Sequence, residues 1–318
     1  MSSAEQIKLL SENIQKVIIG KNEVITKVIA ALLAGGHVLI EDVPGVGKTR
    51  LVTALAKSVN GKYNRIQLTP DVMPSDIVGF TMIHPETKKM SYRQGAAVCN
   101  FLLADEINRA SPKAQSSLLE AMEEQQISIE GQTMKLPRPF MTLATQNPVE
   151  TYGTYHLPEA QMDRFLLRIS IGYPSREEEL QIIDTMNGEN PAATLPAVLG
   201  IEDIIALQEE TRNVSVHSVI KEYIWQIANA TRTNDNIRLG VSPRGSIALL
   251  KVSKAYALIM GRNYVVPDDV QEMLSSALAH RLILSPKGKS SFKSQEALIA
   301  KLMEGIPAPI PQNQAVSQ

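Results

Sequence analysis

Short apolar runs alternate with helical patterns along the first part of this chain of 318 residues. Strand-like segments, apolar or alternating, cover 37–40, 63–69, 100–106, 140–145 and 164–171. Helical periodicity of apolar positions predicts two helices within 5–35 and further helices over 50–57, 75–78, 111–122 and 158–163. Strands that alternate with helices in this way predict an α/β domain built on a parallel sheet.

Two further segments carry the signals of β-hairpins rather than of sheet strands. The first spans 81–93, with a turn around Pro85–Lys88. The second lies around 126–138 and has Glu130-Gly131 at its centre. We therefore expect two hairpin insertions in the α/β domain.

The composition changes at Gly172-Tyr173-Pro174, and no convincing strand pattern follows. Helical patterns cover 175–187, 201–212, 217–231, 243–260, 268–283 and 294–304. We predict an α/β core over 1–172, a smaller all-helical domain over 173–305 and a proline-rich disordered tail over 306–318.

The composition is that of an ordinary globular protein, with 44% hydrophobic residues, 20% charged residues and a net charge of −1. A net charge this close to zero shows no excess of basic residues of the kind that nucleic-acid binding requires. The single cysteine, Cys99, excludes a disulfide framework and cysteine-based zinc sites. We see no signal-peptide core and no apolar run long enough for a membrane helix, so we expect a cytoplasmic protein without direct membrane insertion.

The segment Glu41-Asp-Val-Pro-Gly-Val-Gly-Lys-Thr49 predicts a phosphate-binding loop, because it joins a buried strand to a helix. Main-chain N–H groups at the start of the helix would face the phosphates. Lys48 would reach the β- and γ-phosphates, and the Thr49 hydroxyl would ligate Mg²⁺. The chain has Asp42 where the G-x-x-x-x-G-K-[ST] pattern has its first glycine, and aspartate tolerates the left-handed backbone better than most residues. The alternative is an ordinary glycine turn.

Polar residues follow two other predicted strands, and in an open parallel sheet ligands bind at the carboxyl ends of the strands. Asp105 and Glu106 follow the strand over 100–106, so Asp105 is expected beside the Mg²⁺ and Glu106 as general base for the attacking water. Asn147 follows the strand over 140–145 and could orient the same water. Standing alone, these groups would be a solvated strand end and a turn asparagine before Pro148.

Three features remain open between a structural and a functional interpretation. The apolar corner Val17–Lys21, which contains Ile18 and Ile19, could be core packing or a seat for an adenine. Arg164 could pair with Asp163 on the surface or act as an arginine finger for a neighbouring subunit. Arg244, at the start of a helix in the second domain, could reach the phosphates.

Taken together, these motifs resemble the MoxR family of AAA+ ATPases over nearly the whole chain, from about Ile18 to Glu304. The resemblance rests on Val43–Thr49, Leu103–Arg109, Thr145–Pro148, Leu157–Phe165 and Ser242–Arg244. It implies a P-loop NTPase core of the AAA+ type with a helical lid, in which Asn147 is sensor 1, Arg164 the arginine finger and Arg244 sensor 2. It also implies that the two hairpins are the helix-2 insert and the pre-sensor-1 hairpin, facing a central pore.

The residues predicted to act in this site fall into three groups. Those expected to bind ATP are Ile18, Ile19, Pro44, Gly45, Val46, Gly47, Lys48, Thr49, Arg50 and Asp105. Thr49 and Asp105 are expected to hold Mg²⁺. The expected catalytic residues are Glu106, Asn147, Arg164 and Arg244.

The favoured function is Mg²⁺-dependent ATP hydrolysis that remodels or matures a protein client. The resemblance implies a ring, usually a hexamer, that acts with a von Willebrand factor A-domain protein and an unidentified client. An ATP-switched assembly scaffold with little turnover is the alternative. A DNA-acting motor is a third, for which the sequence has no basic stripe.

Overall fold

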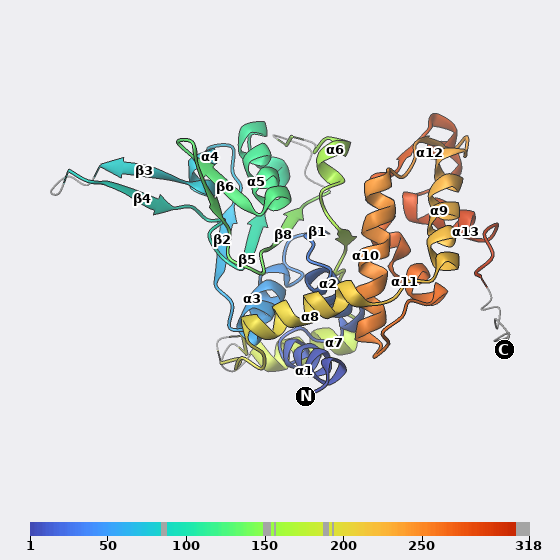
Figure 1. Cartoon of the computed structure of the whole chain (residues 1–318), viewed down its shortest axis with the longest axis horizontal. Helices are drawn as coiled ribbons and strands as arrows, with labels where there is room; N and C mark the ends of the chain where they lie inside the picture. Colours follow the sequence, from blue (N-terminus) through green and yellow to red (C-terminus); the bar gives the residue numbers. More distant parts are fainter. Residues whose placement is uncertain (84–87, 149–153, 156, 187–190, 193, 310–318) are drawn as a thin grey trace, which may run out of the picture. The chain divides into compact units, whose positions relative to one another are not determined.

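The computed structural model describes residues 1–83, 88–148, 154–155, 157–186, 191–192 and 194–309 (Figure 1). The chain divides into two compact units, Met1–Arg212 and Asn213–Gln318. The predicted tip of the first hairpin, at 84–87, lies outside the described residues. So does the predicted disordered tail from residue 310 onward.

A parallel sheet of five strands in the order β2-β5-β8-β1-β9 forms the centre of the first unit. The strands are β1 (Val38–Glu41), β2 (Tyr63–Gln67), β5 (Phe101–Asp105), β8 (Met141–Gln146) and β9 (Leu167–Ile169). Each predicted strand is confirmed, with β9 shorter than its pattern suggested. Because all neighbouring pairs are parallel, their carboxyl ends lie along one edge of the sheet, which we call the carboxyl edge.

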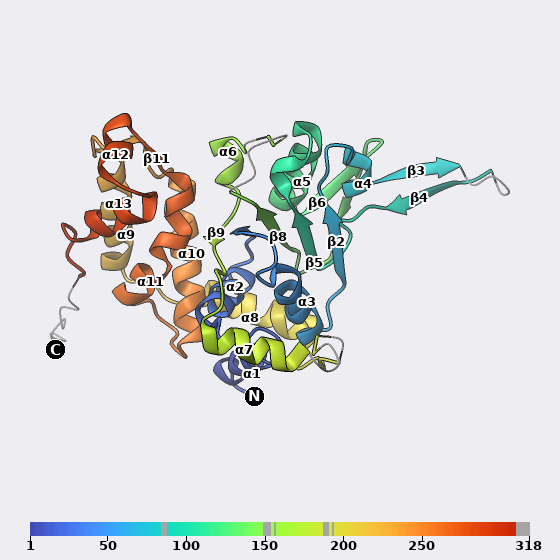
Figure 2. The same ribbon diagram turned by 180° about the vertical axis from the view of Figure 1, so that it is seen from behind.

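Helices cover both faces of this sheet (Figures 1 and 2). On one face Leu118 and Leu119 of α5 belong to the same apolar cluster as Leu102, Ala104 and Ala144 of the sheet. The helices α1, α2 and α3 lie on the other face, where α2 contacts β9 and α3 contacts β5. The helices of this unit are α1 (Ser3–Gln15), α2 (Asn22–Leu33), α3 (Lys48–Ser58), α4 (Pro74–Val78), η1 (Ile107–Arg109), α5 (Pro112–Glu124), α6 (Glu159–Met162), α7 (Arg176–Met186) and α8 (Ile201–Asn213).

Local sequence explains where these helices begin. Ser2 and Glu5 form a capping box at the start of α1. Ser111 accepts a hydrogen bond from the Ala114 N–H at the start of α5, and Pro112 occupies the first helical turn. The predicted helix start at Ser111-Pro112 is therefore confirmed.

Both predicted hairpins form. The first pairs β3 (Gly79–Ile83) with β4 (Met90–Gln94), and the second pairs β6 (Gln126–Ile129) with β7 (Gln132–Lys135). In the second, Glu130 and Gly131 have φ values of 49° and 81°, as a tight hairpin turn requires. The β3–β4 hairpin projects away from the sheet (Figures 1 and 2).

The second unit is mainly helical, as predicted. Its helices are α9 (Ser218–Arg232), α10 (Pro243–Ile259), α11 (Pro267–Leu278), η2 (Ala279–Arg281), α12 (Pro286–Ser291) and α13 (Gln295–Met303). The expectation that no strand follows Gly172 is wrong, because β10 (Ile237–Leu239) and β11 (Ile283–Leu284) form a small antiparallel ladder. Strands this short are too brief to show an alternating pattern. In neither unit do the described residues include a helix long and apolar enough to cross a membrane.

The compact units divide at Arg212, later than the predicted boundary at Gly172. Hydrogen bonds tie the intervening chain to the core. The Asn13 side chain donates to the Pro196 carbonyl over 2.9 Å, and the Gln208 side chain donates to the Leu32 carbonyl over 2.7 Å. Such long-range bonds leave no periodic signal, so the change of composition at Gly172 marked the end of the sheet rather than the end of the unit.

Candidate nucleotide site at the carboxyl edge

The loop after β1 has the backbone geometry of a phosphate-binding loop. Gly45 and Gly47 have φ values of 87° and 95°, which side chains with a Cβ rarely adopt. Gly47 is the N-cap of α3, and Lys48 is its first residue. The main-chain N–H groups of the first turn of α3 therefore point to where the loop would bind an anion.

Lys48 lies among three carboxylates. Its Nζ donates to the Asp42 carbonyl oxygen over 2.6 Å. Burial lowers the pKa of Lys48, and the charges of Asp42, Asp105 and Glu106 oppose that shift. The structure thus brings the loop lysine together with both acidic residues predicted to act beside it.

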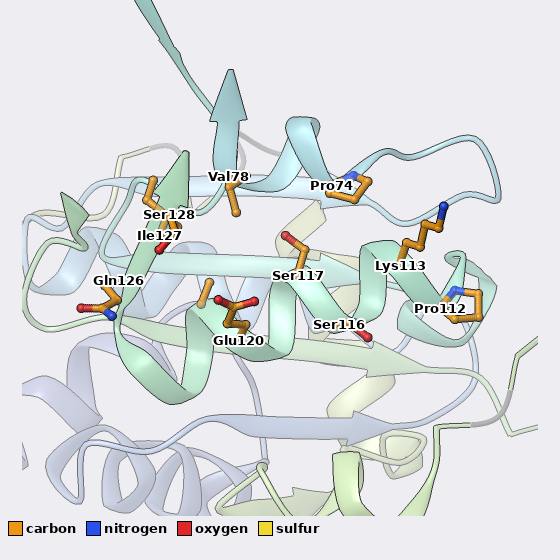
Figure 3. A pocket seen from close by; sticks show the side chains of 11 residues that line it. Pro74, Val78, Pro112, Lys113, Ser116, Ser117, Glu120, Gln126, Ile127 and Ser128 are labelled. Atoms are coloured by element: carbon orange, nitrogen blue, oxygen red, sulfur yellow. The ribbon is translucent and has the colours of Figure 1, made fainter. Parts of the chain in front are cut away.

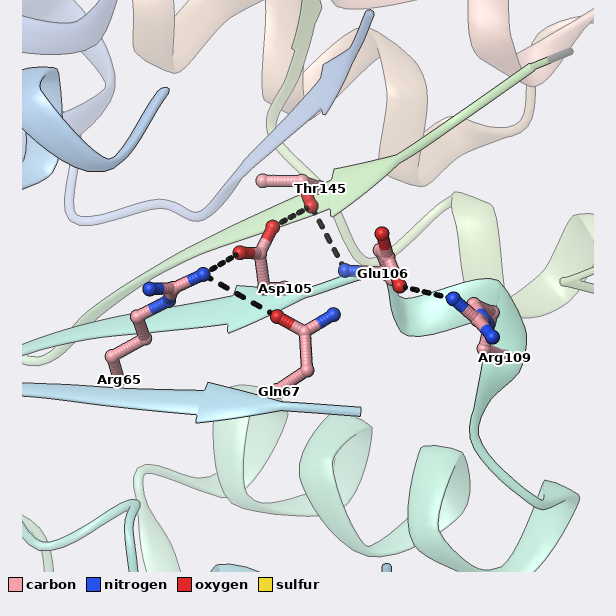
Figure 4. A network of polar contacts seen from close by, with 6 residues as sticks. All are labelled: Arg65, Gln67, Asp105, Glu106, Arg109 and Thr145. Atoms are coloured by element: carbon pink, nitrogen blue, oxygen red, sulfur yellow. Dashed lines mark hydrogen bonds and ion pairs between the residues drawn. The ribbon is translucent and has the colours of Figure 1, made fainter. Parts of the chain in front are cut away.

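Asp105 and Glu106 are joined at the end of β5 by the hydroxyl of Thr145 (Figure 4). Thr145 Oγ1 donates to Asp105 Oδ1 over 2.5 Å and accepts from the Glu106 main-chain N–H over 2.9 Å. Asp105 Oδ2 also lies 2.7 Å from Arg65 Nη2, a side chain of the neighbouring strand β2. Both carboxylate oxygens of Asp105 are thus hydrogen-bonded, one to the buried Thr145 and the other to the exposed Arg65.

Glu106 occupies an unusual backbone position. Its φ is 57°, in the left-handed region that costs a residue with a Cβ about 1 kcal/mol or more. The Glu106 side chain pairs with Arg109 of η1, with Oε2 and Nη1 2.9 Å apart (Figure 4). The turn aims this carboxylate away from the strand, and the Thr145 hydroxyl holds the turn in place.

The other predicted catalytic residues differ in placement. Asn147 is buried directly after β8, at the carboxyl edge. Arg164, after α6, has its Nε 2.9 Å from Glu123 Oε2 of α5. Arg244 lies exposed in the first turn of α10 in the second unit, behind the N-cap Ser242. The structure therefore places Asn147 beside the phosphate loop, and Arg164 in an ion pair with α5.

The remaining residues predicted to contact the nucleotide belong to the phosphate loop, to the start of α3, or to the apolar corner before α2. Ile18 is buried, as core packing requires, and Ile19 is half-buried. The role of this corner as a seat for an adenine stays a prediction. Thr49 and Pro44 are exposed, and Val46 and Arg50 are half-buried.

The oxygen atoms at this edge suit a hard divalent cation. Among the described residues no group of three or more His, Cys, Asp or Glu side chains could hold a metal by itself. Asp105 and the exposed hydroxyl of Thr49 offer only oxygen. Mg²⁺ favours such a partial site, because it keeps several waters and takes further oxygens from bound phosphates.

A hollow of about 570 Å³ lies beside the outer surface of α5 (Figure 3). It is bounded by α4, α5 and β6, with side chains such as Val78, Ser117, Glu120 and Ile127 on its walls. It contains none of the predicted nucleotide contacts. We therefore place the candidate nucleotide site at the carboxyl edge, where the charged groups converge.

Sequence reasoning missed three side chains of this edge: Arg65, Arg109 and Thr145. Arg65 could not be found because the sequence does not say that β2 pairs with β5. Thr145 could have been suspected, since it is a hydroxyl residue near the carboxyl end of a mostly apolar strand. Arg109 is three residues after Glu106, a spacing that brings side chains together only if the chain turns helically there.

Comparisons with known proteins agree with this geometry. Residues 37–167 match the family model described as ATPase family associated with various cellular activities (AAA), and residues 229–302 match the AAA lid domain. The uncharacterized protein YeaC of Bacillus subtilis (strain 168) is 50% identical over 299 residues, covering 94% of this chain and 93% of its own. Chaperone MoxR1 of Mycobacterium tuberculosis is 40% identical over 314 residues, covering 96% of this chain and 82% of its own. The crystal structure of a proposed ATPase from Cytophaga hutchinsonii has a TM-score of 0.90 and 34% identity, covering 97% of this chain and 96% of that one.

Proposed function

Since this chain belongs to the MoxR family of AAA+ ATPases, we propose that it hydrolyses ATP with Mg²⁺ at the carboxyl edge and uses the energy to remodel a protein client. The observation that carries the site assignment is the convergence of Lys48 with Asp105 and Glu106, beside a loop whose glycines leave the amide groups of α3 open to an anion.

In this proposal the phosphate loop binds the triphosphate. Lys48 has three donors and uses one on the Asp42 carbonyl, so two can bond to β- and γ-phosphate oxygens. Thr49 and Asp105 would hold Mg²⁺, which neutralises charge on the phosphates when bound. For Asp105 this means exchanging its bond with Arg65, whose side chain is 48% exposed and free to move into solvent.

Glu106 is the proposed general base. A water attacks the γ-phosphorus and gives its proton to a Glu106 carboxylate oxygen, while the bond from the γ-phosphorus to the bridging oxygen breaks. The products are ADP and phosphate. Thr145 keeps the Glu106 main chain in its left-handed turn, and Asn147 is proposed to orient the water.

We propose that the protein forms a ring, a hexamer, in which Arg164 completes the site of a neighbouring subunit. A guanidinium is planar and always charged, which suits transition-state charge on a transferred phosphoryl group. Glu123 holds it at the surface of the first unit until a neighbour offers phosphate oxygens. Arg244 is proposed as a further phosphate contact from the lid.

The client is proposed to be a protein. The name of the MoxR1 relative describes a chaperone. The β3–β4 hairpin exposes apolar side chains, with Ile83 and Met90 paired across its two strands. Exposed apolar side chains on a projecting hairpin favour protein contacts over phosphate contacts. A von Willebrand factor A-domain protein is the proposed partner for acting on this client.

Turnover and its dependence on Lys48 test the proposed reaction. The wild type should release phosphate from ATP with Mg²⁺, whereas Lys48→Ala should lose ATP affinity and turnover together. The matched control is Lys113→Ala, which removes an exposed lysine on α5 and should leave both unchanged. ATP binding without phosphate release by concentrated wild type would instead support the scaffold alternative.

Mixing two inactive variants tests the ring. Lys48→Ala supplies an intact Arg164, and Arg164→Ala supplies an intact phosphate loop, so mixed rings should regain activity. The double variant Lys48→Ala/Arg164→Ala mixed with Arg164→Ala is the control, because no finger remains, and it should stay inactive. Equal recovery in both mixtures, or none where mixed assemblies form, would refute a finger that acts between subunits.

A further inference from the structure

Asp42 replaces the first glycine of the loop pattern, and its carboxylate is fully engaged inside the first unit. The side chain is 7% exposed. Its Oδ2 accepts from the main-chain N–H groups of Ile171 and Gly172 over 2.6 and 2.7 Å, and from the Ser170 hydroxyl over 3.1 Å. Its Oδ1 accepts from the Val43 N–H over 3.0 Å. Four donors hold this buried charge, so its side chain cannot turn without leaving several of them unpaired.

The main chain of Asp42 is held as well. Its N–H donates to the Gln146 carbonyl over 3.1 Å, next to Asn147. Its carbonyl accepts from Lys48 Nζ over 2.6 Å. One residue thus connects the phosphate-loop lysine, the end of β8 and the chain that leaves β9.

The chain that leaves β9 has a second attachment. Lys21 Nζ donates to the Tyr173 carbonyl over 2.8 Å and lies 3.8 Å from Glu178 of α7. Lys21 ends the apolar corner that contains Ile18 and Ile19. The segment 170–178 is therefore hydrogen-bonded to Asp42 of the phosphate loop and to Lys21 of the apolar corner at 17–21. These are the two parts of the chain proposed to bind the phosphates and the base.

We propose that Asp42 is a positioning residue for the proposed ATPase, which aims Lys48 and couples nucleotide binding to the segment 170–178. The inference rests on the proposed function. Because the carboxylate fixes the Asp42 peptide, the carbonyl oxygen fixes one of the three Lys48 donors and aims the other two. A glycine at this position has no side chain with which to hold the amides of Ile171 and Gly172.

Two substitutions remove the hydrogen bonds of the Asp42 carboxylate in different ways. Asp42→Asn keeps the shape but turns an N–H donor toward the donors of residues 170–172, and Asp42→Gly restores the common loop pattern without any acceptor. In both, the main-chain carbonyl that accepts from Lys48 remains but is no longer held by the side-chain bonds of residue 42. Lys48 is then aimed less well, and the dissociation constant for ADP should rise about tenfold, as for a weakened hydrogen bond to a charged group. The matched control is Asn13→Ala, a buried residue that ties Ser58 to the Pro196 carbonyl elsewhere in the same unit. It should lose stability but keep its ADP affinity.

Hydrogen exchange tests the coupling itself. In the wild type, saturating ADP should slow amide exchange in peptides that cover 168–178, because opening them requires breaking the Asp42 bonds next to the occupied loop. The same peptides should exchange faster in Asp42→Asn and Asp42→Gly without ADP, and saturating ADP should not slow them. Asn13→Ala should show the wild-type response.

The outcomes separate this inference from the proposed function. If the wild type binds ADP but the Asp42 variants show the same ADP-induced protection of 168–178, the coupling role is wrong and the nucleotide site stands. If the wild type binds no ADP or ATP, the proposed function fails first. Should both Asp42 variants fail to fold, Ser170→Ala removes a single donor and should show a smaller loss of protection. Unchanged protection in Ser170→Ala would then overturn the inference.

Discussion

Both edges of the central sheet carry titratable side chains, but the side chains have different partners at the amino edge, where the strands begin, and at the carboxyl edge, where they end. At the amino edge, His37 precedes β1 and is 5% exposed. Its Nε2 lies 2.9 Å from the Met122 carbonyl and its Nδ1 2.9 Å from the Thr142 N–H, which fixes Nε2 as the donor and Nδ1 as the acceptor. Cys99, two residues before β5, is buried completely. Both groups are common in active sites, yet here main-chain groups hold them.

The difference lies in what accompanies burial. At the amino edge burial outweighs the groups that oppose it. It lowers the pKa of His37 to about 4 against the opposing bond to the Met122 carbonyl, and it raises the pKa of Cys99 to about 12 against the charge of Lys62 and two main-chain hydrogen bonds. At the carboxyl edge Lys48 is also partly buried, but three carboxylates oppose the shift of its pKa. At the amino edge burial prevails and keeps both groups neutral, whereas at the carboxyl edge three carboxylates favour the charged form of Lys48 that a phosphate needs. The type of residue alone does not separate the two.

The largest effect should come from Glu106→Gln at the carboxyl edge. The amide cannot accept the proton of the attacking water, so turnover should fall by about 10²–10⁴ while ATP still binds. Phosphate release and equilibrium ATP binding measure the two quantities. Glu124→Gln, an exposed carboxylate at the end of α5, is the control and should have full activity. If binding and turnover fell together, Glu106 would be a structural residue like those of the amino edge.

At the amino edge, His37 should make the first unit sensitive to acid. The folded form holds the imidazole neutral with a pKa of about 4, against about 6.5 when unfolded, so the unfolded chain binds the extra proton. The stabilisation is present above pH 6.5 and is lost as the pH falls toward 4, by up to about 3 kcal/mol. Urea unfolding at pH 7.5, 5.5 and 4.5 measures it.

A substitution isolates the His37 contribution. His37→Gln can donate to Met122 and accept from Thr142 but does not titrate, so its stability should depend less on pH over this range. His217→Gln, at an exposed N-cap of α9, should keep the wild-type dependence on pH. An equal pH dependence in His37→Gln and the wild type would mean that His37 is not held neutral.

The comparison of edges also explains what the sequence could and could not predict. Apolar runs, glycines and helix starts are local signals, so the strands, both hairpins and the loop at Gly45–Thr49 could be predicted. Asp105 and Glu106 could be assigned because each strand ends where its apolar run ends. These features depend only on residues near one another in the chain.

Features that depend on strand adjacency could not be predicted. Arg65 reaches Asp105 only because β2 lies beside β5, and Asp42 meets Gly172 only because β1 lies beside β9. Asp42 departs from the loop pattern, and its role could not be predicted because its partners at 170–172 lie far along the chain. For the same reason nothing near His37 in the chain distinguishes it from an active-site histidine.

Thr145→Val tests whether the carboxyl edge depends on its hydrogen bonds. Valine keeps the shape but leaves the Glu106 N–H without its acceptor and the Oδ1 atom of Asp105 without its donor. Turnover should fall about 10- to 100-fold, as for outer partners of metal ligands, and stability by about 1–3 kcal/mol. Thr142→Val, in the same strand, removes a buried hydroxyl that has no partner among the described residues, and it should be neutral. Equal losses in both variants would show that Thr145 acts only through packing.

The smallest effect is predicted for the Cys99 thiol, which should hardly react in the folded protein. Burial raises its pKa to about 12, and its Sγ lies 3.4 Å from the carbonyl oxygens of Ala96 and Phe101. Near neutral pH the thiolate fraction is about 10³-fold lower than for an ordinary thiol, and only the thiolate attacks a disulfide reagent. Because Cys99 is the single cysteine, release of thionitrobenzoate from Ellman's reagent reports on it alone. Reaction should be slow in the native protein and complete in urea. ADP should slow it further only as far as ligand binding stabilises the fold around β5. Rapid native labelling would mean that the amino edge opens readily, and the contrast between the two edges would then rest on His37 alone.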